Sequence, residues 1–223
     1  MPTISLILLK LTQTEIALPK KAIIFDLDNT IYSVRSIGNE IFAPLFEILF
    51  KDGANAGNAE RIKEEIMRTP FQKVASEFQF SEEMTQQCLD LLKNSRYSGA
   101  IKPFEDYQIA RSLPIEKFLV TTGFLNLQDS KIDGMNIRAD FKEIDIVDPM
   151  TSTRTKKDVF ANILKNHQYN NTDLLVVGDD MHSEIKAAQE LGIDVVLYDK
   201  FNIYQGQTSV PKISNFQQLE FYI

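Results

Sequence analysis

Two aspartates follow a short apolar run near the start of the chain. The stretch Ala22 to Thr30 reads Ala-Ile-Ile-Phe-Asp-Leu-Asp-Asn-Thr, so Asp26 and Asp28 are two residues apart. On a strand, side chains at i and i+2 point the same way, which predicts that both carboxylates leave a buried strand together. Close, buried carboxylates repel each other and need a cation or a shared proton. The alternative is a structural pair, in which Asp26 caps a turn and Asp28 caps a following helix.

A second apolar run, Asp173 to Gly178, ends in the same way. It leads into Asp179, Asp180 and, after three more residues, Glu184, which opens a helical pattern closed by Gly192. If both runs are strands of one parallel sheet, their carboxylates meet at the edge where α/β proteins bind ligands. Such an oxygen-rich ligand set suits Mg²⁺ better than zinc.

Two further segments carry weaker signals. The run Phe118–Val120 ends in Thr-Thr-Gly at 121–123, whose hydroxyls and backbone N–H groups can hold phosphate oxygens, although this tripeptide is also an ordinary turn. A helix start at 154–158 carries cations that can neutralise a phosphate and a carboxylate together, although a solvated helix start has the same composition. These cations are Arg154, Lys156 and Lys157.

Only a parallel sheet brings these segments to one place. Short apolar strands alternate with helical patterns from Lys21 onward, which predicts a Rossmann-like α/β core with helices on both faces of the sheet. The predicted strands are Ala22–Leu27, Lys117–Thr121, Ile144–Val147, Leu174–Val177 and Val195–Tyr198. The predicted helices between them are at about Phe104–Ser112, Leu125–Asp133, Lys156–Asn166 and Ser183–Leu191.

The alternation stops between Asp28 and Phe104, where the apolar residues follow a helical spacing instead. We therefore predict a small all-helical domain at 34–102, inserted into a core domain formed by 1–33 and 103–223. An insertion at this point would lie over the carboxylates as a lid that excludes water and selects substrate. The helical segments are Ile37–Lys51, Ala59–Met67 and Ser81 to about Arg96, with Ser81 as a cap.

Composition and charge limit the class of protein. A chain of 223 residues, 43% hydrophobic and 25% charged, is long enough for one α/β domain with an insertion. Its net charge of −7 argues against binding to a nucleic-acid polymer. The single cysteine, Cys88, is typical of a reducing compartment, and the apolar run Ile4–Leu9 is a poor signal peptide. Since no stretch is long enough to span a membrane, we expect a cytoplasmic protein that does not act at membranes.

Taken in order, these motifs resemble those of the haloacid dehalogenase superfamily. The resemblance covers nearly all of 21–198, and the helical insertion is similar to the superfamily's type 1 cap. It implies a hydrolase of the phosphatase branch, because the dehalogenase branch lacks an acid at the position of Asp28. The matching residues are Asp26-Leu27-Asp28-Asn29-Thr30, then Thr121, then a basic residue near Lys156, then Gly178-Asp179-Asp180 with Glu184.

The resemblance also implies roles. Asp26 would be the nucleophile that forms an aspartyl-phosphate, and Asp28 would protonate the leaving alcohol and then activate water. Lys156 would be the basic residue, with Arg154 and Lys157 as alternatives. The residues implied for holding the phosphoryl group and the substrate are Thr121, Thr122, Gly123 and Asn29. The residues implied for Mg²⁺ are Asp26, Asp28 through its carbonyl, Asp179, and either Asp180 or Glu184.

We therefore expect a Mg²⁺-dependent phosphatase that acts on a small phosphorylated metabolite, such as a nucleoside monophosphate or a sugar phosphate. One alternative is a phosphomutase, which would return the phosphoryl group from Asp26 to a bound sugar phosphate. Another is a non-catalytic phosphate- or partner-binding protein on the same fold. A binding module needs no acid at Asp28, and nothing in 34–102 shows the specialisation of a mutase cap.

Overall fold

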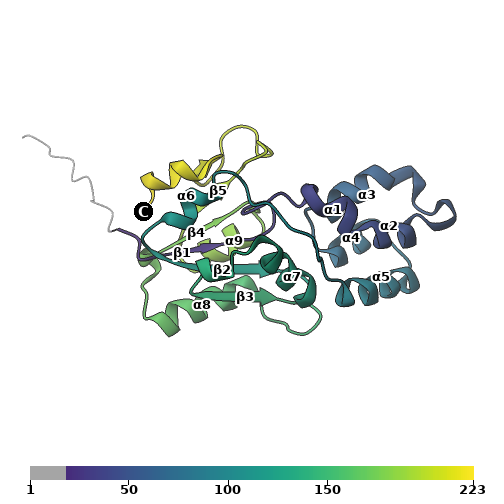
Figure 1. Ribbon diagram of the computed structural model, residues 1–223, viewed down its shortest axis with the longest axis horizontal. Coiled ribbons are helices and arrows are strands. Elements are labelled where there is room, and N and C mark those ends of the chain that lie inside the picture. Colours follow the sequence, from purple (N-terminus) through teal and green to yellow (C-terminus); the bar gives the residue numbers. More distant parts are fainter. Residues whose placement is uncertain (1–18) are drawn as a thin grey trace, which may run out of the picture.

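The computed structural model describes residues 19–223 and shows a parallel sheet with a group of helices beside it (Figure 1). The strands are β1 (Ala22–Phe25), β2 (Glu116–Thr122), β3 (Glu143–Val147), β4 (Leu174–Gly178), β5 (Asp194–Tyr198) and β6 (Lys212–Ile213). Within the described residues, the sheet order is β3-β2-β1-β4-β5-β6, and every pairing is parallel. The predicted α/β fold class is confirmed, and the run Ile4–Leu9 lies outside the described residues.

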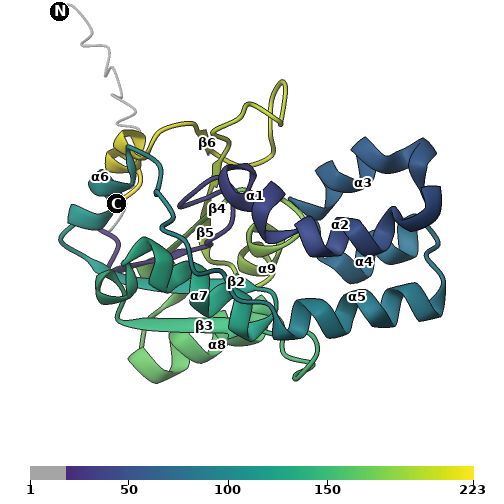
Figure 2. The same cartoon turned by 45° about the vertical axis from the view of Figure 1, so that its right-hand side comes forward.

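Helices cover both faces of the sheet (Figure 2). One apolar layer contains α6 and α7, and the opposite layer contains α8 and α9. These helices are α6 (Tyr107–Ser112), α7 (Leu125–Met135), α8 (Lys156–His167) and α9 (Glu184–Gln189). The predicted strands and core helices agree with the structure to within three residues at each end. The two-residue strand β6 was not predicted, because so short a segment has no recognisable alternation.

The central strand β1 is apolar throughout because it is buried on both faces. Ile23 and Phe25 pack in the layer of α7, whereas Ala22 and Ile24 pack in the layer of α8 and α9. Each of these side chains is at most 1% exposed. Burial of an aliphatic or aromatic side chain contributes about 1.5–3 kcal/mol. The strand therefore holds the residue that follows it, Asp26, on a rigid support.

The register of the sheet brings the predicted site residues to one edge. Phe25 of β1 pairs with Leu119 of β2 and with Val177 of β4. The backbone N–H of Asp26 still donates to the carbonyl of Val177, at 3.0 Å. The ends of β1, β2 and β4 are therefore level, and the side chains that follow them share the carboxyl edge of the sheet.

The helical module, which we define as residues 35–94, lies beyond this edge (Figure 1). Ser81 caps the longest of its helices as predicted, accepting a hydrogen bond from the backbone N–H of Met84 at 3.2 Å. The helices of the module are α1 (Arg35–Ile41), α2 (Ala43–Leu49), α3 (Ala59–Ile66), α4 (Phe71–Glu77) and α5 (Glu82–Asn94). None of the helices between residues 19 and 223 has the length and apolarity that a membrane span requires.

The helical module differs from the prediction at two prolines. Ile37–Lys51 forms two helices that meet at Phe42, because Pro44 in the first turn of α2 has no N–H with which to continue the ladder from α1. No helix was predicted directly after Pro70, yet the Pro70 carbonyl accepts hydrogen bonds from the N–H groups of Lys73 and Val74 at the start of α4. Short 3₁₀ turns lie at Lys51–Gly53, Ala56–Asn58, Arg138–Asp140, Asn171–Asp173 and Phe216–Phe221.

Candidate active site

Three carboxylates converge at the carboxyl edge of the sheet. Asp26 directly follows β1, Asp179 directly follows β4, and Glu184 is the first residue of α9. One oxygen from each lies within 4.8 Å of the others. Asp26 and Glu184 are buried, and Asp179 is partly buried. We call this group the carboxylate cluster.

Lys156 is the cation of the carboxylate cluster. Its Nζ donates to Asp26 Oδ1 at 2.5 Å and to Glu184 Oε2 at 2.8 Å, and its side chain is 7% exposed. The other two cations of this helix start bind elsewhere: Arg154 pairs with Asp145 at 3.0 Å, and Lys157 pairs with Glu190 at 2.9 Å. Of the three alternatives, the structure thus places Lys156 at the cluster.

The electrostatics of the cluster favour a divalent cation. Burial raises the pKa of Asp26 to about 7, opposed by Lys156 and assisted by the charge of Glu184. Burial and the charges of Glu184 and Asp26 also raise the pKa of Asp179 well above its usual range. The single ammonium of Lys156 therefore does not neutralise the negative charge that the three carboxylates would carry when ionised. A set of close, buried carboxylate oxygens is the ligand chemistry that a hard cation such as Mg²⁺ requires, so these residues fit that metal.

Asp180 lies outside the carboxylate cluster. Its Oδ1 accepts a hydrogen bond from the backbone N–H of His182 at 2.7 Å, and its side chain lines the adjoining pocket. Its backbone N–H donates to Glu184 Oε1 at 2.7 Å. Of the two alternatives for the metal shell, the structure brings Glu184 to Asp26 and Asp179.

Gly178, the last residue of β4, makes room for Glu184. A Cβ at this position would lie 2.2 Å from Glu184 Oε1 and 2.5 Å from its Cδ. Glu184 cannot move away freely, because its two oxygens are held by Lys156 and by the N–H of Asp180. A side chain at position 178 is therefore incompatible with the cluster as it stands.

We expect Gly178→Ala to displace Glu184 and to lower Mg²⁺ affinity and turnover by about 10- to 100-fold, the usual effect of disturbing a residue that supports a metal ligand. Metal affinity is measured by calorimetric titration. The matched control is Gly57→Ala, because a Cβ on Gly57 would meet nothing within 4 Å. Unchanged Mg²⁺ affinity in Gly178→Ala would show that Glu184 does not hold the metal.

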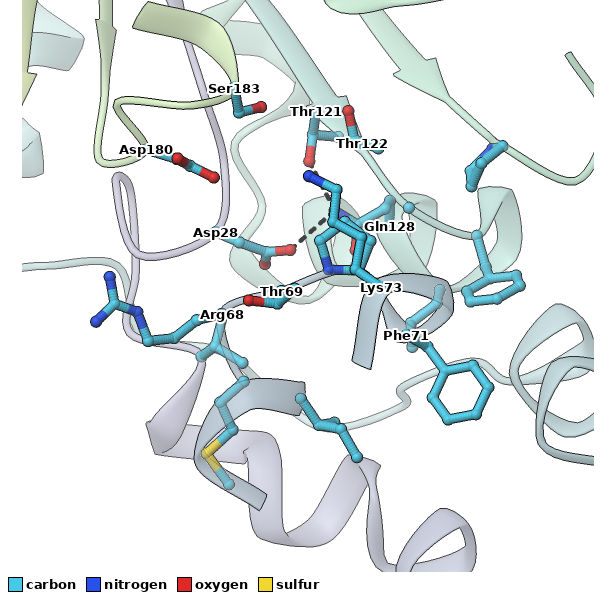
Figure 3. Close-up of a pocket in the computed structure, with 18 of the residues that line it drawn as sticks. Asp28, Arg68, Thr69, Phe71, Lys73, Thr121, Thr122, Gln128, Asp180 and Ser183 are labelled. Atoms are coloured by element: carbon cyan, nitrogen blue, oxygen red, sulfur yellow. Dashed lines mark hydrogen bonds between the residues drawn. The ribbon is translucent and has the colours of Figure 1, made fainter. Parts of the chain in front are cut away.

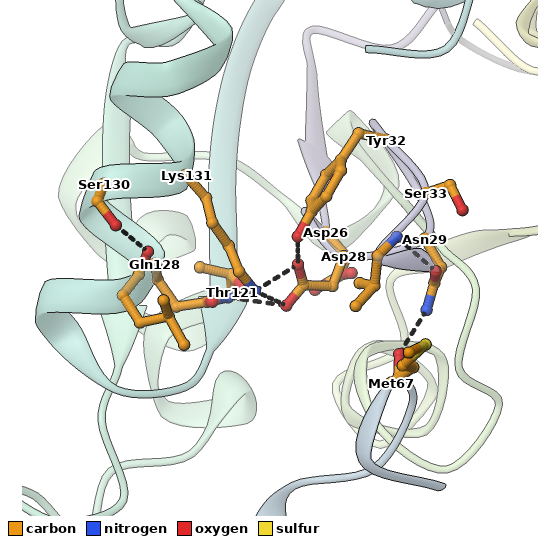
Figure 4. Close-up of polar contacts among 12 residues, drawn as sticks. Asp26, Asp28, Asn29, Tyr32, Ser33, Met67, Thr121, Gln128, Ser130 and Lys131 are labelled. Atoms are coloured by element: carbon orange, nitrogen blue, oxygen red, sulfur yellow. Dashed lines mark hydrogen bonds and ion pairs between the residues drawn. The ribbon is translucent and has the colours of Figure 1, made fainter. Parts of the chain in front are cut away.

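Asp28 is bound by three side chains that the sequence analysis did not single out (Figure 4). Tyr32 Oη donates to Asp28 Oδ1 at 2.6 Å, and Gln128 Nε2 donates to Oδ2 at 3.0 Å. The ammonium of Lys131, which is 3% exposed, contacts both oxygens at 2.9 and 3.0 Å. Burial acts to raise the pKa of Asp28, but the charge of Lys131 and these hydrogen bonds outweigh it and lower the pKa.

A weak signal for two of these residues was present in the sequence. Gln128 and Lys131 are three residues apart, so they share a face of α7. The contacts of both residues with Asp28 place that face at the sheet edge, which the sequence spacing alone does not determine. Tyr32 carried no comparable signal.

Thr121, Thr122 and Gly123 all line the pocket beside the cluster. Thr121 is buried at the end of β2, and its Oγ1 accepts a hydrogen bond from Gln128 Nε2 at 2.7 Å. Gly123 leaves room for the Gln128 side chain, because a Cβ at position 123 would lie 2.9 Å from Gln128 Cδ. Gln128 therefore connects Thr121 to Asp28, and the predicted phosphate-binding roles of these residues stay predictions.

Asn29 connects the loop after β1 to the helical module (Figure 4). Its amide oxygen accepts from the backbone N–H of Val34 at 3.1 Å, and its amide nitrogen donates to the carbonyl of Met67 at 3.4 Å. Its φ of 58° lies in the left-handed region, which asparagine tolerates. The side chain thus has protein partners on both sides, and its predicted contact with substrate stays a prediction.

A pocket of about 510 Å³ separates the sheet edge from the helical module (Figure 3). Residues of the carboxylate cluster and Asp28 line it from the core. Arg68, Phe71 and Lys73 line it from the helical module. Chemically, the arrangement offers a buried carboxylate, a second carboxylate for proton transfer and cations for an anionic substrate.

In addition to the fold and the paired carboxylates, the sequence itself matches a family of hydrolases. The sequence profile of the haloacid dehalogenase-like hydrolases matches residues 23–198. The chain therefore belongs to the haloacid dehalogenase-like hydrolase family, as predicted. No curated protein matches the sequence.

Solved structures of this family share the fold. The hydrolase YfnB from Bacillus subtilis, solved with bound magnesium, aligns with a TM-score of 0.62 and 17% identity over 92% of this chain and 99% of its own. A haloacid dehalogenase-like phosphatase from Thermococcus onnurineus aligns with a TM-score of 0.58 and 15% identity over 91% of this chain and 97% of its own. A 2-haloacid dehalogenase from Pseudomonas syringae aligns with a TM-score of 0.53 and 15% identity, also over 91% of this chain and 97% of its own. Since both chemistries occur on this fold, the reaction has to be argued from the site.

Proposed function

We propose that this chain is a Mg²⁺-dependent phosphatase that hydrolyses a small phosphorylated metabolite through an aspartyl-phosphate on Asp26. The observation that supports this most is the pairing of Asp26 with Asp28 at the carboxylate cluster. Asp26 alone would serve any reaction that begins with carboxylate attack. A second, separately held carboxylate adds the proton transfers that phosphate ester hydrolysis needs.

Asp26 would attack phosphorus, forming the aspartyl-phosphate while the bond to the leaving alcohol breaks. Lys156 fixes Asp26 Oδ1 and offsets charge at the cluster. Asp28 would pass a proton from the singly protonated phosphate ester, whose second pKa is about 6, to the leaving oxygen, and would later take one from the attacking water. Its lowered pKa suits the second role, because an ionised carboxylate is the form that accepts a proton. Mg²⁺, held by Asp26, Asp179 and Glu184, would stabilise the negative charge of the phosphoryl oxygens.

We propose that the two domains of the chain have different roles. The core domain, residues 1–33 and 103–223, supplies the chemistry, and the helical domain, residues 34–102, supplies recognition. This is supported by the pocket, which core residues line on one side and residues of the α3–α4 region on the other. Asn29, which bonds to Met67 of the helical domain, lies at the connection between the two.

The first test is metal dependence. We expect phosphate release from a panel of phosphomonoesters with Mg²⁺, loss of release with EDTA, and poor substitution by Ca²⁺, which prefers more ligands at longer distances. Turnover in a chelator, or release of halide from 2-haloacids without release of phosphate, would contradict the proposal.

Thermal unfolding gives a second readout that does not depend on activity. Because the pKa of Asp26 is raised to about 7, the metal-free protein should lose stability as the pH rises through 7 and this carboxyl ionises. Mg²⁺ binds the ionised form, so it should raise the melting temperature more at pH 8 than at pH 6. An equal Mg²⁺ effect at both pH values would argue against binding at Asp26.

A further inference from the structure

Two cations of the helical module face the pocket. Arg68 lies in the segment between α3 and α4, and Lys73 lies in the first turn of α4. Both line the pocket and both are exposed. In Figure 3, Arg68 and Lys73 come from the helical module, whereas Thr121, Thr122 and Asp180 come from the core. They are therefore placed to meet the part of a substrate that projects away from the sheet edge.

These cations differ from the others nearby in having no carboxylate partner. No ion pair or side-chain hydrogen bond joins Arg68 or Lys73 to any carboxylate within residues 19–223, whereas Lys131 binds one carboxylate and Lys156 binds two. Three cations of the same module pair with its glutamates. They are Arg35 with Glu64, Arg61 with Glu77, and Lys63 with Glu60.

Their place at the pocket distinguishes Arg68 and Lys73, because Lys51 and Lys93 of the same module also form no ion pair within residues 19–223. Cations left unpaired at the wall of a pocket attract an anionic ligand, and both ammonium and guanidinium groups bind carboxylates and phosphates well. The transferring phosphoryl group has its own cation, Lys156, at Asp26. An anion for Arg68 and Lys73 has to come from elsewhere on the substrate.

We propose that Arg68 and Lys73 bind a second anionic group, carried by the leaving-group part of the substrate. This inference deepens the proposed phosphatase function and rests on it. It narrows the substrate class to phosphomonoesters that carry a carboxylate or a further phosphate. Neutral alcohol phosphates would then be poorer substrates, because they leave both cations without a partner.

The test compares esters that differ only in this charge. The short pair is 3-phosphoglycerate and glycerol 3-phosphate, and the long pair is 4-carboxyphenyl phosphate and 4-carbamoylphenyl phosphate. We measure kcat/KM with Mg²⁺ for the wild type, for Arg68→Gln and Lys73→Gln, and for the control Lys63→Gln. Lys63 is on the same module, but its partner is Glu60 at 2.8 Å, on the surface.

We expect the wild type to prefer the acid of at least one pair by about 10- to 100-fold, the range that charge-assisted contacts give. Arg68→Gln and Lys73→Gln should reduce this preference by lowering kcat/KM for the acid more than for the neutral ester, and Lys63→Gln should change neither value. The inference is overturned if neither acid is preferred, or if the two variants slow acid and neutral esters equally, since the cations would then serve the transferring phosphoryl group. Hydrolysis of none of the four esters would contradict the proposed function itself.

Discussion

Replacing Asp26 with asparagine is expected to lower turnover by at least about a thousandfold while leaving the fold intact. The amide has nearly the same shape, so the support that β1 gives to this position is retained. It is a poor nucleophile, however, and it is a weaker metal ligand. Phosphate release is measured at saturating substrate and Mg²⁺, with circular dichroism to verify the fold.

The matched control for this variant is Asp180→Asn. Asp180 lines the same pocket, but its Oδ1 caps the backbone N–H of His182, a contact that an amide oxygen also makes. We expect it to retain turnover to within about tenfold. If Asp26→Asn keeps more than about a thousandth of wild-type activity, or if Asp180→Asn is the variant that fails, Asp26 is not the nucleophile.

Lys156→Met is expected to be the most damaging of these changes to stability. It removes the ammonium that contacts Asp26 at 2.5 Å and Glu184 at 2.8 Å. Because both carboxylates are buried, the loss of their partner should cost about 3–5 kcal/mol of unfolding free energy in the metal-free protein at pH 8. At pH 6 the cost should be smaller, since carboxyls that lose a neighbouring cation take up protons more readily. Urea unfolding at the two pH values measures this difference.

Lys157→Met serves as the control for Lys156→Met. Lys157 is the next residue on α8, but it pairs with Glu190 at 2.9 Å where both side chains are more than 40% exposed. Exposed ion pairs contribute about 0–1 kcal/mol, so this variant should be almost unchanged in stability and turnover. Equal effects of the two substitutions would mean that a general change at the helix start, and not the ion pair at the cluster, is responsible.

The parts of the site that follow strand ends could be predicted from the sequence. Asp26 and Asp179 each come directly after a short apolar run, and buried parallel strands have that pattern. Once both runs are placed in one sheet, the common edge follows from topology. Glu184 could only be narrowed to one of two acids, because the choice depends on how α9 starts. In the structure, Gly178 leaves the space that Glu184 occupies.

The environment of Asp28 could not be predicted, because it depends on contacts between distant parts of the chain. Gln128 and Lys131 are 100 and 103 residues away from Asp28 along the sequence. A buried lysine on an amphipathic helix has the same local pattern as one in solvent, so only the packing of α7 distinguishes them. The same holds for Lys73, since its position in the pocket depends on a helix that begins at Phe71, directly after Pro70, which by itself indicates a break.

The measurement that tests the account most directly is the burst of product from Asp28→Asn with 4-nitrophenyl phosphate and Mg²⁺. Nitrophenolate leaves without a proton, so this variant should still phosphorylate Asp26, but it lacks the carboxylate that activates water for the second step. We predict a rapid burst of about one nitrophenolate per chain followed by slow release, with the phosphoryl group found on the peptide that contains Asp26. Steady release at the wild-type rate without a burst, or a burst that leaves no phosphoryl group on that peptide, would contradict hydrolysis through Asp26.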